Sequence, residues 1–234
     1  YYASLGLDFL WDDGMHPLLD AMPDDINATA FWAAGKLYAV AAMKAPCVML
    51  DTDLICWKNI DALLDDADAA AIHREDIIPS IYPGKAAFSR SNGFDFDAFD
   101  WSVQPLNTAL CSFSDDDFRR FYADTAIRFM RSAPQADDTL PYMVFAEQRL
   151  LAMCAQACGV PIHAFSTEQD LFQGNQHDFT HIWGFKQAMQ EQPVLRELFC
   201  KKCAARIRKD FPIYANICQT IPQLRPYFQQ HSDL

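Results

Sequence analysis

Residues 45–57 read APCVMLDTDLICW, and this stretch decides the predicted fold. An apolar run, CVML, ends directly in Asp51 and Asp53, after which the chain returns to apolar residues. Alternate side chains of an extended segment share a face, so the two carboxylates are expected side by side at the end of a buried strand. Such a pair is unfavourable unless one carboxylate is protonated or a cation lies between them. The stretch therefore predicts an acid pair that needs a proton or a cation.

The segments around this stretch alternate between helical and strand patterns. Residues 29–45 are rich in alanine, have apolar residues at helical spacing and end before Pro46. Further helices are expected at residues 60–64, 115–130, 145–158 and 194–207, and strands at residues 47–50, 67–73, 106–113 and 160–165. Asp115 is the expected N-cap of one helix, and Gly159 the expected end of another. This alternation predicts an α/β fold with a central mixed, mainly parallel sheet flanked by helices.

Size and composition exclude several classes of protein. The chain has 234 residues, of which 51% are hydrophobic, and this suits one globular domain with a sizeable core. It contains no run of about 20 apolar residues, so no membrane span is expected. The formal net charge of -12 argues against a nucleic-acid partner and against binding to an anionic membrane surface.

Eight cysteines are scattered through mostly apolar segments, where thiols act as small core residues. Reduced thiols are typical of a cytoplasmic protein, and that location is expected here. Cys200 and Cys203 form a C-x-x-C, but no second pair at zinc-ligand spacing follows, so one turn of a helix is the expected structure.

The D-x-D pattern occurs four times, so its context must discriminate. The pairs that begin at Asp66, Asp95 and Asp115 fit solvated loops or helix caps, whereas only Asp51 and Asp53 follow an uninterrupted apolar strand. Ligands of open α/β sheets bind at the carboxyl ends of the strands. Mn²⁺ and Mg²⁺ take one or two protein carboxylates and complete their shell with water and substrate phosphates. The pair at positions 51 and 53 thus predicts a metal bound to a diphosphate.

Residues 31–57, FWAAGKLYAVAAMKAPCVMLDTDLICW, resemble the heart of a nucleotide-sugar-dependent glycosyltransferase of the GT-A fold. The similarity is to the bacterial galactosyltransferase, glycogenin-like, capsular and mannosyl transferase families, whose sheet is Rossmann-type. By this resemblance, Asp51 and Asp53 hold Mn²⁺ (or Mg²⁺) against the donor diphosphate, and Lys36 stands at the basic position ahead of the motif. The alternative for Lys36 is a solvated helix lysine.

Two later segments extend the resemblance. Residues 105–113, PLNTALCSF, are similar to the segment that carries an Asn beside the donor sugar, which makes Asn107 a candidate sugar contact. Residues 180–186, THIWGFK, resemble an H-x-x-G-x-x-K element in which the His is a third metal ligand and the Lys touches the diphosphate. His181 and Gly184 match this element, whereas Lys186 stands one residue early and the usual Pro-Trp is absent.

Residues 144–152, VFAEQRLLA, resemble the segment that supplies an acidic or amide side chain near the reacting carbon. Glu147 and Gln148 are therefore the candidate catalytic residues. The alternative is an acid at a helix N-terminus, where the helix dipole favours it. The loop of residues 78–92, with Tyr82, Phe88 and Arg90, is where aromatic stacking on an acceptor sugar is expected. The alternative is that its aromatic residues are hydrophobic anchors.

The resemblance covers about residues 29–186 and implies one glycosyltransferase-like domain over residues 1–234, with a C-terminal helical extension at 187–234. Residues 1–28 are too few to supply all of the usual first nucleotide-binding strand. The implied activity of this bacterial-type enzyme is Mn²⁺-dependent transfer of a sugar, most simply from a UDP-sugar, to a hydroxyl of a glycan, lipid or protein acceptor. Two alternatives stay open. One is a non-catalytic sugar- or nucleotide-binding scaffold, and the other a haloacid-dehalogenase-type phosphatase with Asp51 as nucleophile, which the apolar residues 54–57 disfavour.

Overall fold

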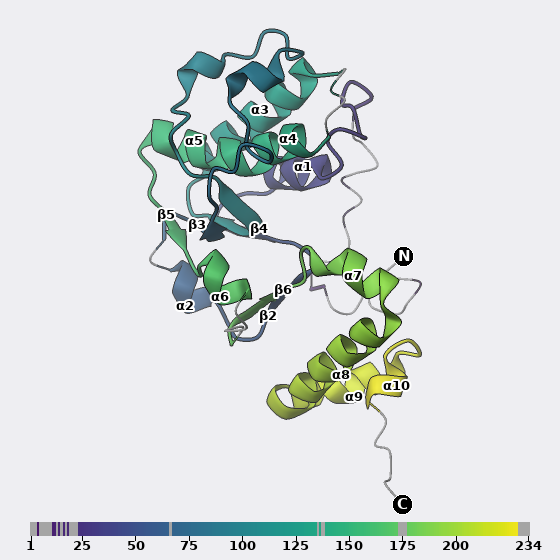
Figure 1. Cartoon of the computed structure of the whole chain (residues 1–234). Coiled ribbons are helices and arrows are strands. Elements are labelled where there is room, and N and C mark those ends of the chain that lie inside the picture. Colours follow the sequence, from purple (N-terminus) through teal and green to yellow (C-terminus); the bar gives the residue numbers. More distant parts are fainter. Residues whose placement is uncertain are drawn as a thin grey trace, which may run out of the picture. The chain divides into compact units, whose positions relative to one another are not determined.

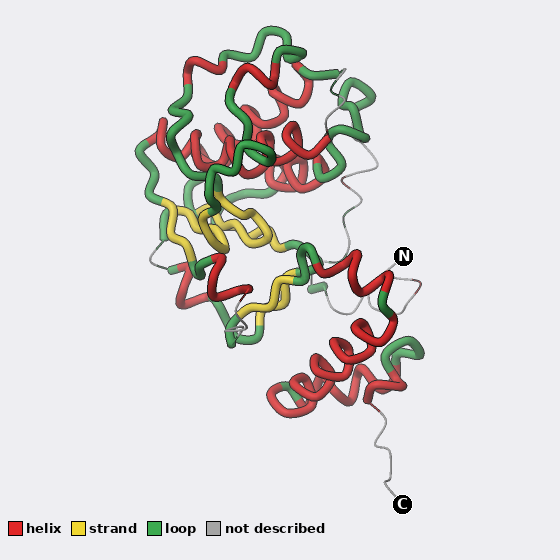
Figure 2. Tube along the Cα trace, in the orientation of Figure 1, coloured by secondary structure: helices red, strands yellow, loops and turns green. Residues whose placement is uncertain are grey.

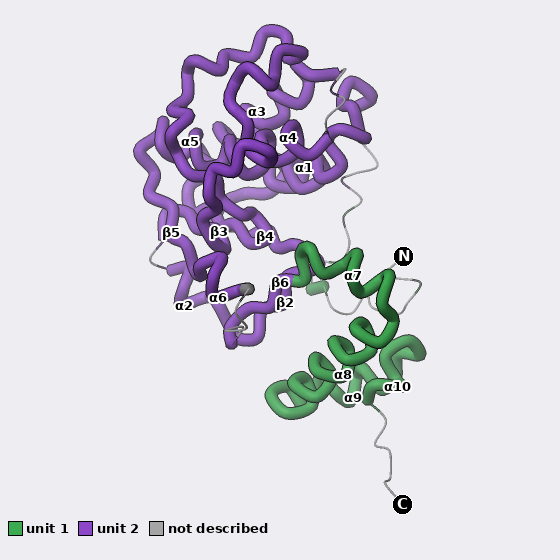
Figure 3. The backbone as a smooth tube through the Cα atoms, in the orientation of Figure 1, with its two compact units in different colours: residues 1–16, 182–234 green, residues 17–181 purple. Residues whose placement is uncertain are grey.

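The computed structural model describes residues 23–65, 67–134, 136, 139–172 and 177–228, with six isolated earlier positions (4, 11, 12, 14, 16 and 18). The chain divides into two compact units (Figure 3). Residues 17–181 form the first, which we call the sheet unit, and residues 1–16 and 182–234 form the second, which we call the helical unit. Most of residues 1–22, where part of a nucleotide-binding strand is expected, lies outside the described residues, as does Asp66. A single domain with an extension from residue 187 stays a prediction.

The sheet unit is α/β and contains a mixed sheet of four strands in the order β1-β4-β3-β5. Figure 1 labels β3, β4 and β5 of this sheet. The strands are β1 (Cys47–Leu50), β4 (Leu106–Phe113), β3 (Ala69–Arg74) and β5 (Ile162–Ala164). β4 runs antiparallel to both β1 and β3, and only β3 and β5 are parallel. The prediction of a mainly parallel sheet is therefore wrong.

The reason lies in the connection between β3 and β4. A parallel pair needs a crossover that carries the chain back to the strand's starting end, usually through a helix. Residues 75–105 instead return to the sheet at the end where β3 stops, so that Arg74 pairs with Leu106 and the Glu75 amide donates to the Pro105 carbonyl. β4 must then run antiparallel to β3.

The sheet lies between two sets of elements (Figure 2). One face packs on α1 (Ala34–Ala42), α3 (Asp116–Ser132), α4 (Thr139–Val144) and α5 (Leu150–Cys158). The other face meets the ribbon of β2 (Leu54–Cys56) and β6 (Phe179–His181), with α2 (Asp61–Leu64) and α6 (Glu168–Phe172) nearby. Cys111 of β4 belongs to the first core and Leu110 to the second, as alternation along a strand requires. Every residue of β4 is consequently buried.

Two helix ends predicted from the sequence are confirmed. The Asp115 carboxylate accepts a hydrogen bond from the Phe118 amide at 2.7 Å, which makes it the N-cap of α3. Gly159 follows α5 with φ 67°, the left-handed conformation that glycine adopts without strain. The helix expected to start at residue 145 begins earlier, at Thr139, and passes through a π-helical turn at Phe145–Arg149.

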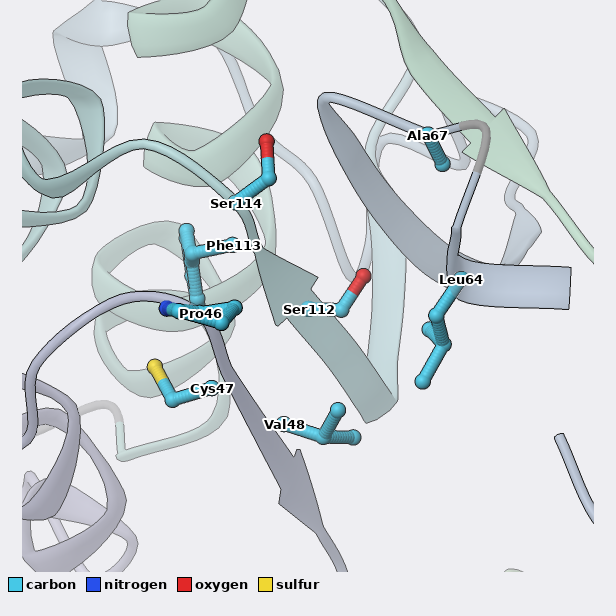
Figure 4. Close-up of a pocket in the computed structure, with 8 residues that line it drawn as sticks. All are labelled: Pro46, Cys47, Val48, Leu64, Ala67, Ser112, Phe113 and Ser114. Atoms are coloured by element: carbon cyan, nitrogen blue, oxygen red, sulfur yellow. The ribbon is translucent and has the colours of Figure 1, made fainter. Parts of the chain in front are cut away.

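β1 is an edge strand, not a buried one as predicted. Its pairing leaves one side open, and Val48 and Leu50 are 40% and 46% exposed. Beside its first residues lies an apolar pocket of about 210 Å³, which Figure 4 shows between β1, the end of β4 and Leu64. The described residues that line the pocket include no carboxylate, amine or imidazole, and the pocket lies at the end of β1 opposite to Asp51.

The long loop of residues 75–105 carries two 3₁₀ turns, Lys85–Phe88 and Phe96–Ala98, and packs through its aromatic residues. Phe88 is 1% exposed and its ring centroid lies 4.6 Å from that of Phe145. Tyr82 is 4% exposed. The expectation that these two rings stack on an acceptor sugar is wrong, because both rings are buried in the protein.

The helical unit contains α7 (Phe185–Glu191), α8 (Pro193–Asp210), α9 (Pro212–Thr220) and α10 (Arg225–Phe228). α8, α9 and α10 share a small core of Ala204, Ala215 and Phe228. Among the described residues, no helix combines the length and the apolar character needed to cross a membrane. All eight cysteines are free thiols, Cys200 and Cys203 included.

Candidate metal centre

The carboxyl end of β1 positions Asp51 and Asp53. The Asp51 amide donates to the Ala109 carbonyl of β4 at 2.7 Å, and the Leu54 amide donates to the Asp51 carbonyl at 3.1 Å. The second bond closes a turn over residues 51–54, so the pair does not lie on an extended segment as expected. The turn sends the chain into β2 and leaves both carboxylates at this end of the sheet.

Strand pairing brings His181 to the same place. In the antiparallel ribbon, Leu54 of β2 pairs with His181 of β6, which puts the imidazole next to the turn that carries Asp53. A side-chain hydrogen bond also links the two segments of the ribbon, since Trp57 Nε1 donates to Thr180 Oγ1 at 2.8 Å. Two segments about 130 positions apart in sequence thereby meet at one point.

Asp51, Asp53 and His181 form one cluster. One potential ligand atom from each lies within 4.8 Å of the others, and His181 Nε2 is 3.9 Å from Asp53 Oδ2. Among the described residues, no other group of His, Cys, Asp and Glu side chains has this geometry. Two carboxylates and a largely buried imidazole suit a divalent cation that also takes oxygen ligands from water or phosphate. The donor set thus fits Mn²⁺, while metal binding itself stays a prediction.

Lys36 of α1 supplies a positive charge beside this cluster. Its Nζ lies 2.7 Å from each carboxylate oxygen of Asp51 and 2.6 Å from Glu147 Oε1. Burial alone would lower the pKa of Lys36, but the charges of Glu147 and Asp51 outweigh it and raise the pKa above its ordinary value. The solvated helix lysine is therefore the wrong interpretation of Lys36. This ammonium also offsets part of the repulsion between the two acids.

Glu147 is held in the core of the sheet unit. Its side chain is 3% exposed, and its Oε1 accepts hydrogen bonds from Lys36 and, at 2.6 Å, from Thr108 Oγ1 of β4. Its backbone carbonyl accepts from the Tyr122 hydroxyl at 2.7 Å. Glu147 lies in the π-helical turn rather than on a first α-helical turn, so the helix-dipole explanation does not apply.

Asn107 and Gln148 belong to a second polar group, around Glu75. Asn107 Nδ2 donates to Glu75 Oε1 at 2.7 Å, and Asn107 Oδ1 accepts from the Ala109 amide at 3.1 Å. The Tyr82 hydroxyl contacts both Glu75 Oε2, at 2.5 Å, and Gln148 Oε1. Burial, and then the charge of Glu75, raise the pKa of Tyr82 well above its ordinary value.

Sequence reasoning missed Glu75 and Thr108. Glu75 directly follows β3 as Asp51 follows β1, so the same strand-end argument would have singled it out. Thr108 carries no comparable signal, because its importance comes only from its contact with Glu147.

Gly184 and Lys186 belong to the helical unit and not to the unit that carries the acid pair. Gly184 precedes α7 with φ -63°, and a Cβ placed on it would meet no atom within 4 Å. Nothing in the local backbone therefore requires glycine at this position. A contact of Lys186 with a diphosphate stays a prediction.

Comparison of the chain with protein-family models, with curated proteins and with solved structures found no match. The case for a function therefore rests on the resemblance of the motifs and on the geometry of this cluster.

Proposed function

We propose that this chain is a metal-dependent glycosyltransferase of the GT-A type that uses a nucleoside-diphosphate sugar, with a UDP-sugar as the first candidate. The observation that carries the proposal is the convergence of Asp51, Asp53 and His181 next to Lys36. Strand-end carboxylates with an added imidazole suit a cation that also binds a diphosphate. An α/β sheet with the acid pair at a strand end supports the proposal, whereas the antiparallel pairing of β4 departs from a Rossmann-type parallel sheet.

Each residue then has a defined task. Asp51, Asp53 and His181 would hold Mn²⁺ or Mg²⁺, which when bound supplies positive charge against the departing nucleoside diphosphate. Lys36 holds the Asp51 and Glu147 carboxylates in place, because its ammonium contacts both. Glu147 and Gln148, adjacent in the π-helical turn, are the candidates to bind the sugar or the acceptor hydroxyl.

The proposal is tested by nucleotide release from UDP-sugars. We expect the purified chain to release UDP from at least one of UDP-glucose, UDP-galactose and UDP-N-acetylglucosamine only when Mn²⁺ or Mg²⁺ is present. Asp53→Asn should reduce the rate by about 100-fold, a typical loss when one charge-stabilising group is removed. Asp97→Asn is the matched control, since Asp97 is the second acid of another D-x-D and its ion pair with Lys85 is exposed.

Other outcomes assign the site to a different class. Release of phosphate from p-nitrophenyl phosphate that is lost in Asp51→Asn would overturn the proposal in favour of the phosphatase. Metal and UDP binding without any turnover of UDP-sugars would overturn it in favour of a non-catalytic scaffold.

A further inference from the structure

Residues 182–234, the C-terminal part of the helical unit, differ in charge from the rest of the chain. Residues 182–234 contain eight of the 19 Lys and Arg residues but only four of the 31 Asp and Glu residues. The C-terminal part is therefore basic, and the net charge of -12 arises entirely from the remainder of the chain. Over distances greater than about 8–10 Å, salt screens exposed charges, so a surface responds to its own charge rather than to the net charge of the chain.

The same part of the chain exposes large apolar side chains. Val194 and Leu198 of α8 are 73% and 60% exposed, and Ile213 and Tyr214 of α9 are 74% and 56% exposed. Leu195 is 36% exposed. Single exposed apolar residues are common, so only those that share a helix face with charged residues carry an argument.

Helical spacing puts apolar and basic residues of α8 on one face. Positions 194, 198, 201, 202 and 209 fall within one third of the helix circumference at 3.6 residues per turn. They are Val194, Leu198, Lys201, Lys202 and Lys209, which we call the outer face of α8. Ala204, on the other side of the helix, is 2% exposed and packs in the core with α9 and α10. The outer face is thus presented by a helix that is anchored from behind.

We propose that the outer face of α8 docks on an anionic phospholipid bilayer surface. Apolar side chains enter the boundary between headgroups and acyl chains, while the lysines bury their methylene stems and keep their ammonium groups at the anionic headgroups. Pairing of two copies through this face would bring its lysines against one another. The charge therefore favours a lipid surface over a second copy.

Co-sedimentation of the full chain with vesicles tests this inference without any sugar donor, so its failure is distinguishable from failure of the proposed function. We expect binding to vesicles that contain phosphatidylglycerol, little binding to phosphatidylcholine alone, and release by high salt. Lys202→Glu with Lys209→Glu should reduce the bound fraction at least tenfold. Val194→Ser with Leu198→Ser should reduce the bound fraction even at low salt, because the double change removes the apolar side chains that enter the bilayer.

Lys44→Glu with Lys85→Glu is the matched control, since it makes the same change in net charge on the sheet unit; circular dichroism checks that each variant is folded. Equal losses in the control and in the α8 variants would overturn the proposal, as would equal binding to both kinds of vesicle. No binding to either kind, or a dimer in sedimentation that the Val194 and Leu198 changes dissociate, would also overturn it.

Discussion

At the scale of single residues, Lys36 is the side chain on which the acid cluster depends. Its ammonium contacts Asp51 and Glu147 at 2.6–2.7 Å, and Glu147 is buried. Removing one partner of such a group leaves a carboxylate in the core with too few compensating contacts. We expect Lys36→Met to lower the free energy of unfolding, measured by urea unfolding at neutral pH, by about 3 kcal/mol. This is the lower end of the range for breaking a buried ion pair, because Lys36 is partly exposed.

A double-mutant cycle separates this electrostatic effect from lost packing. Glu147→Gln removes the buried charge and keeps an acceptor for the Thr108 hydroxyl. In the Lys36→Met background it should therefore cost less than in wild type, or stabilise the protein. Strictly additive losses would show that Lys36 and Glu147 do not act as an ion pair.

Asp53 tests the metal more directly than Lys36 does. Asp53→Asn keeps the side-chain size and removes one negative charge close to Asp51 and His181. We expect the metal-free variant to melt at the wild-type temperature or above it, since like-charge repulsion falls. Mn²⁺ should raise the melting temperature of wild type, because binding to the native state alone stabilises it, and should raise that of the variant much less. Equal metal-induced shifts in both proteins would mean that Asp53 is not a ligand.

Tyr82 predicts the behaviour of the protein at alkaline pH. Its pKa is raised in the folded state, so the folded protein retains a phenolic proton that the unfolded chain loses above about pH 10. The stability that Tyr82 contributes is therefore complete below that pH and is lost as the pH rises further. Tyr82→Phe should be less stable than wild type at about pH 8, with the difference shrinking by about pH 11, as measured by urea unfolding. A difference that is constant across this range would contradict the assignment.

At the scale of elements, Asp115 was predicted from the sequence as the N-cap of α3, and its contribution to the stability of the protein can be measured. Asp115→Ala removes the acceptor of the Phe118 amide and should cost about 1 kcal/mol of stability. Asp117→Ala is the control, since Asp117 also lies in the first turn but makes only an exposed pair with Arg120. Equal losses in the two variants would show that helix dipole and net charge, rather than the cap, set the stability of this end.

Local sequence signals predicted the elements better than their arrangement. The apolar run at 47–50 and the Asp115 cap are readable because propensity and capping depend on neighbours in the chain. The direction of β4 is not, because it depends on how residues 75–105 return to the sheet. The turn at 51–54 and the short strands β2 and β6 are set by pairing with distant residues, which no local pattern encodes.

The same distinction applies to the candidate site. Asp51 and Asp53 are visible because they follow an apolar run, and His181 entered only through the resemblance of residues 180–186. What brings His181 to the acids is its pairing opposite Leu54. Glu75 was missed because its role depends on Asn107 and Tyr82, which are remote from it or lie in an irregular loop.

At the scale of the whole molecule, the sheet unit contains the complete acid cluster, while Lys186 belongs to the helical unit. By the resemblance, Lys186 touches the diphosphate, so metal binding and nucleotide binding are expected to depend on different residues. Two successive melts, first with Mn²⁺ alone and then with Mn²⁺ and UDP, separate these contributions, because each ligand adds stability according to its own dissociation constant.

Lys186→Gln is the change that distinguishes the two contributions. The substitution leaves Asp51, Asp53 and His181 intact, so the shift with Mn²⁺ alone should equal that of wild type. Loss of one charge-assisted contact to phosphate should then weaken UDP binding by about tenfold. The additional rise in melting temperature on adding UDP should be smaller than in wild type. Lys201→Gln should change neither shift, since Lys201 is an exposed lysine of the same unit that pairs with Glu197. A wild-type response of Lys186→Gln to UDP would mean that the sheet unit binds the nucleotide by itself and that residues 180–186 contribute only His181.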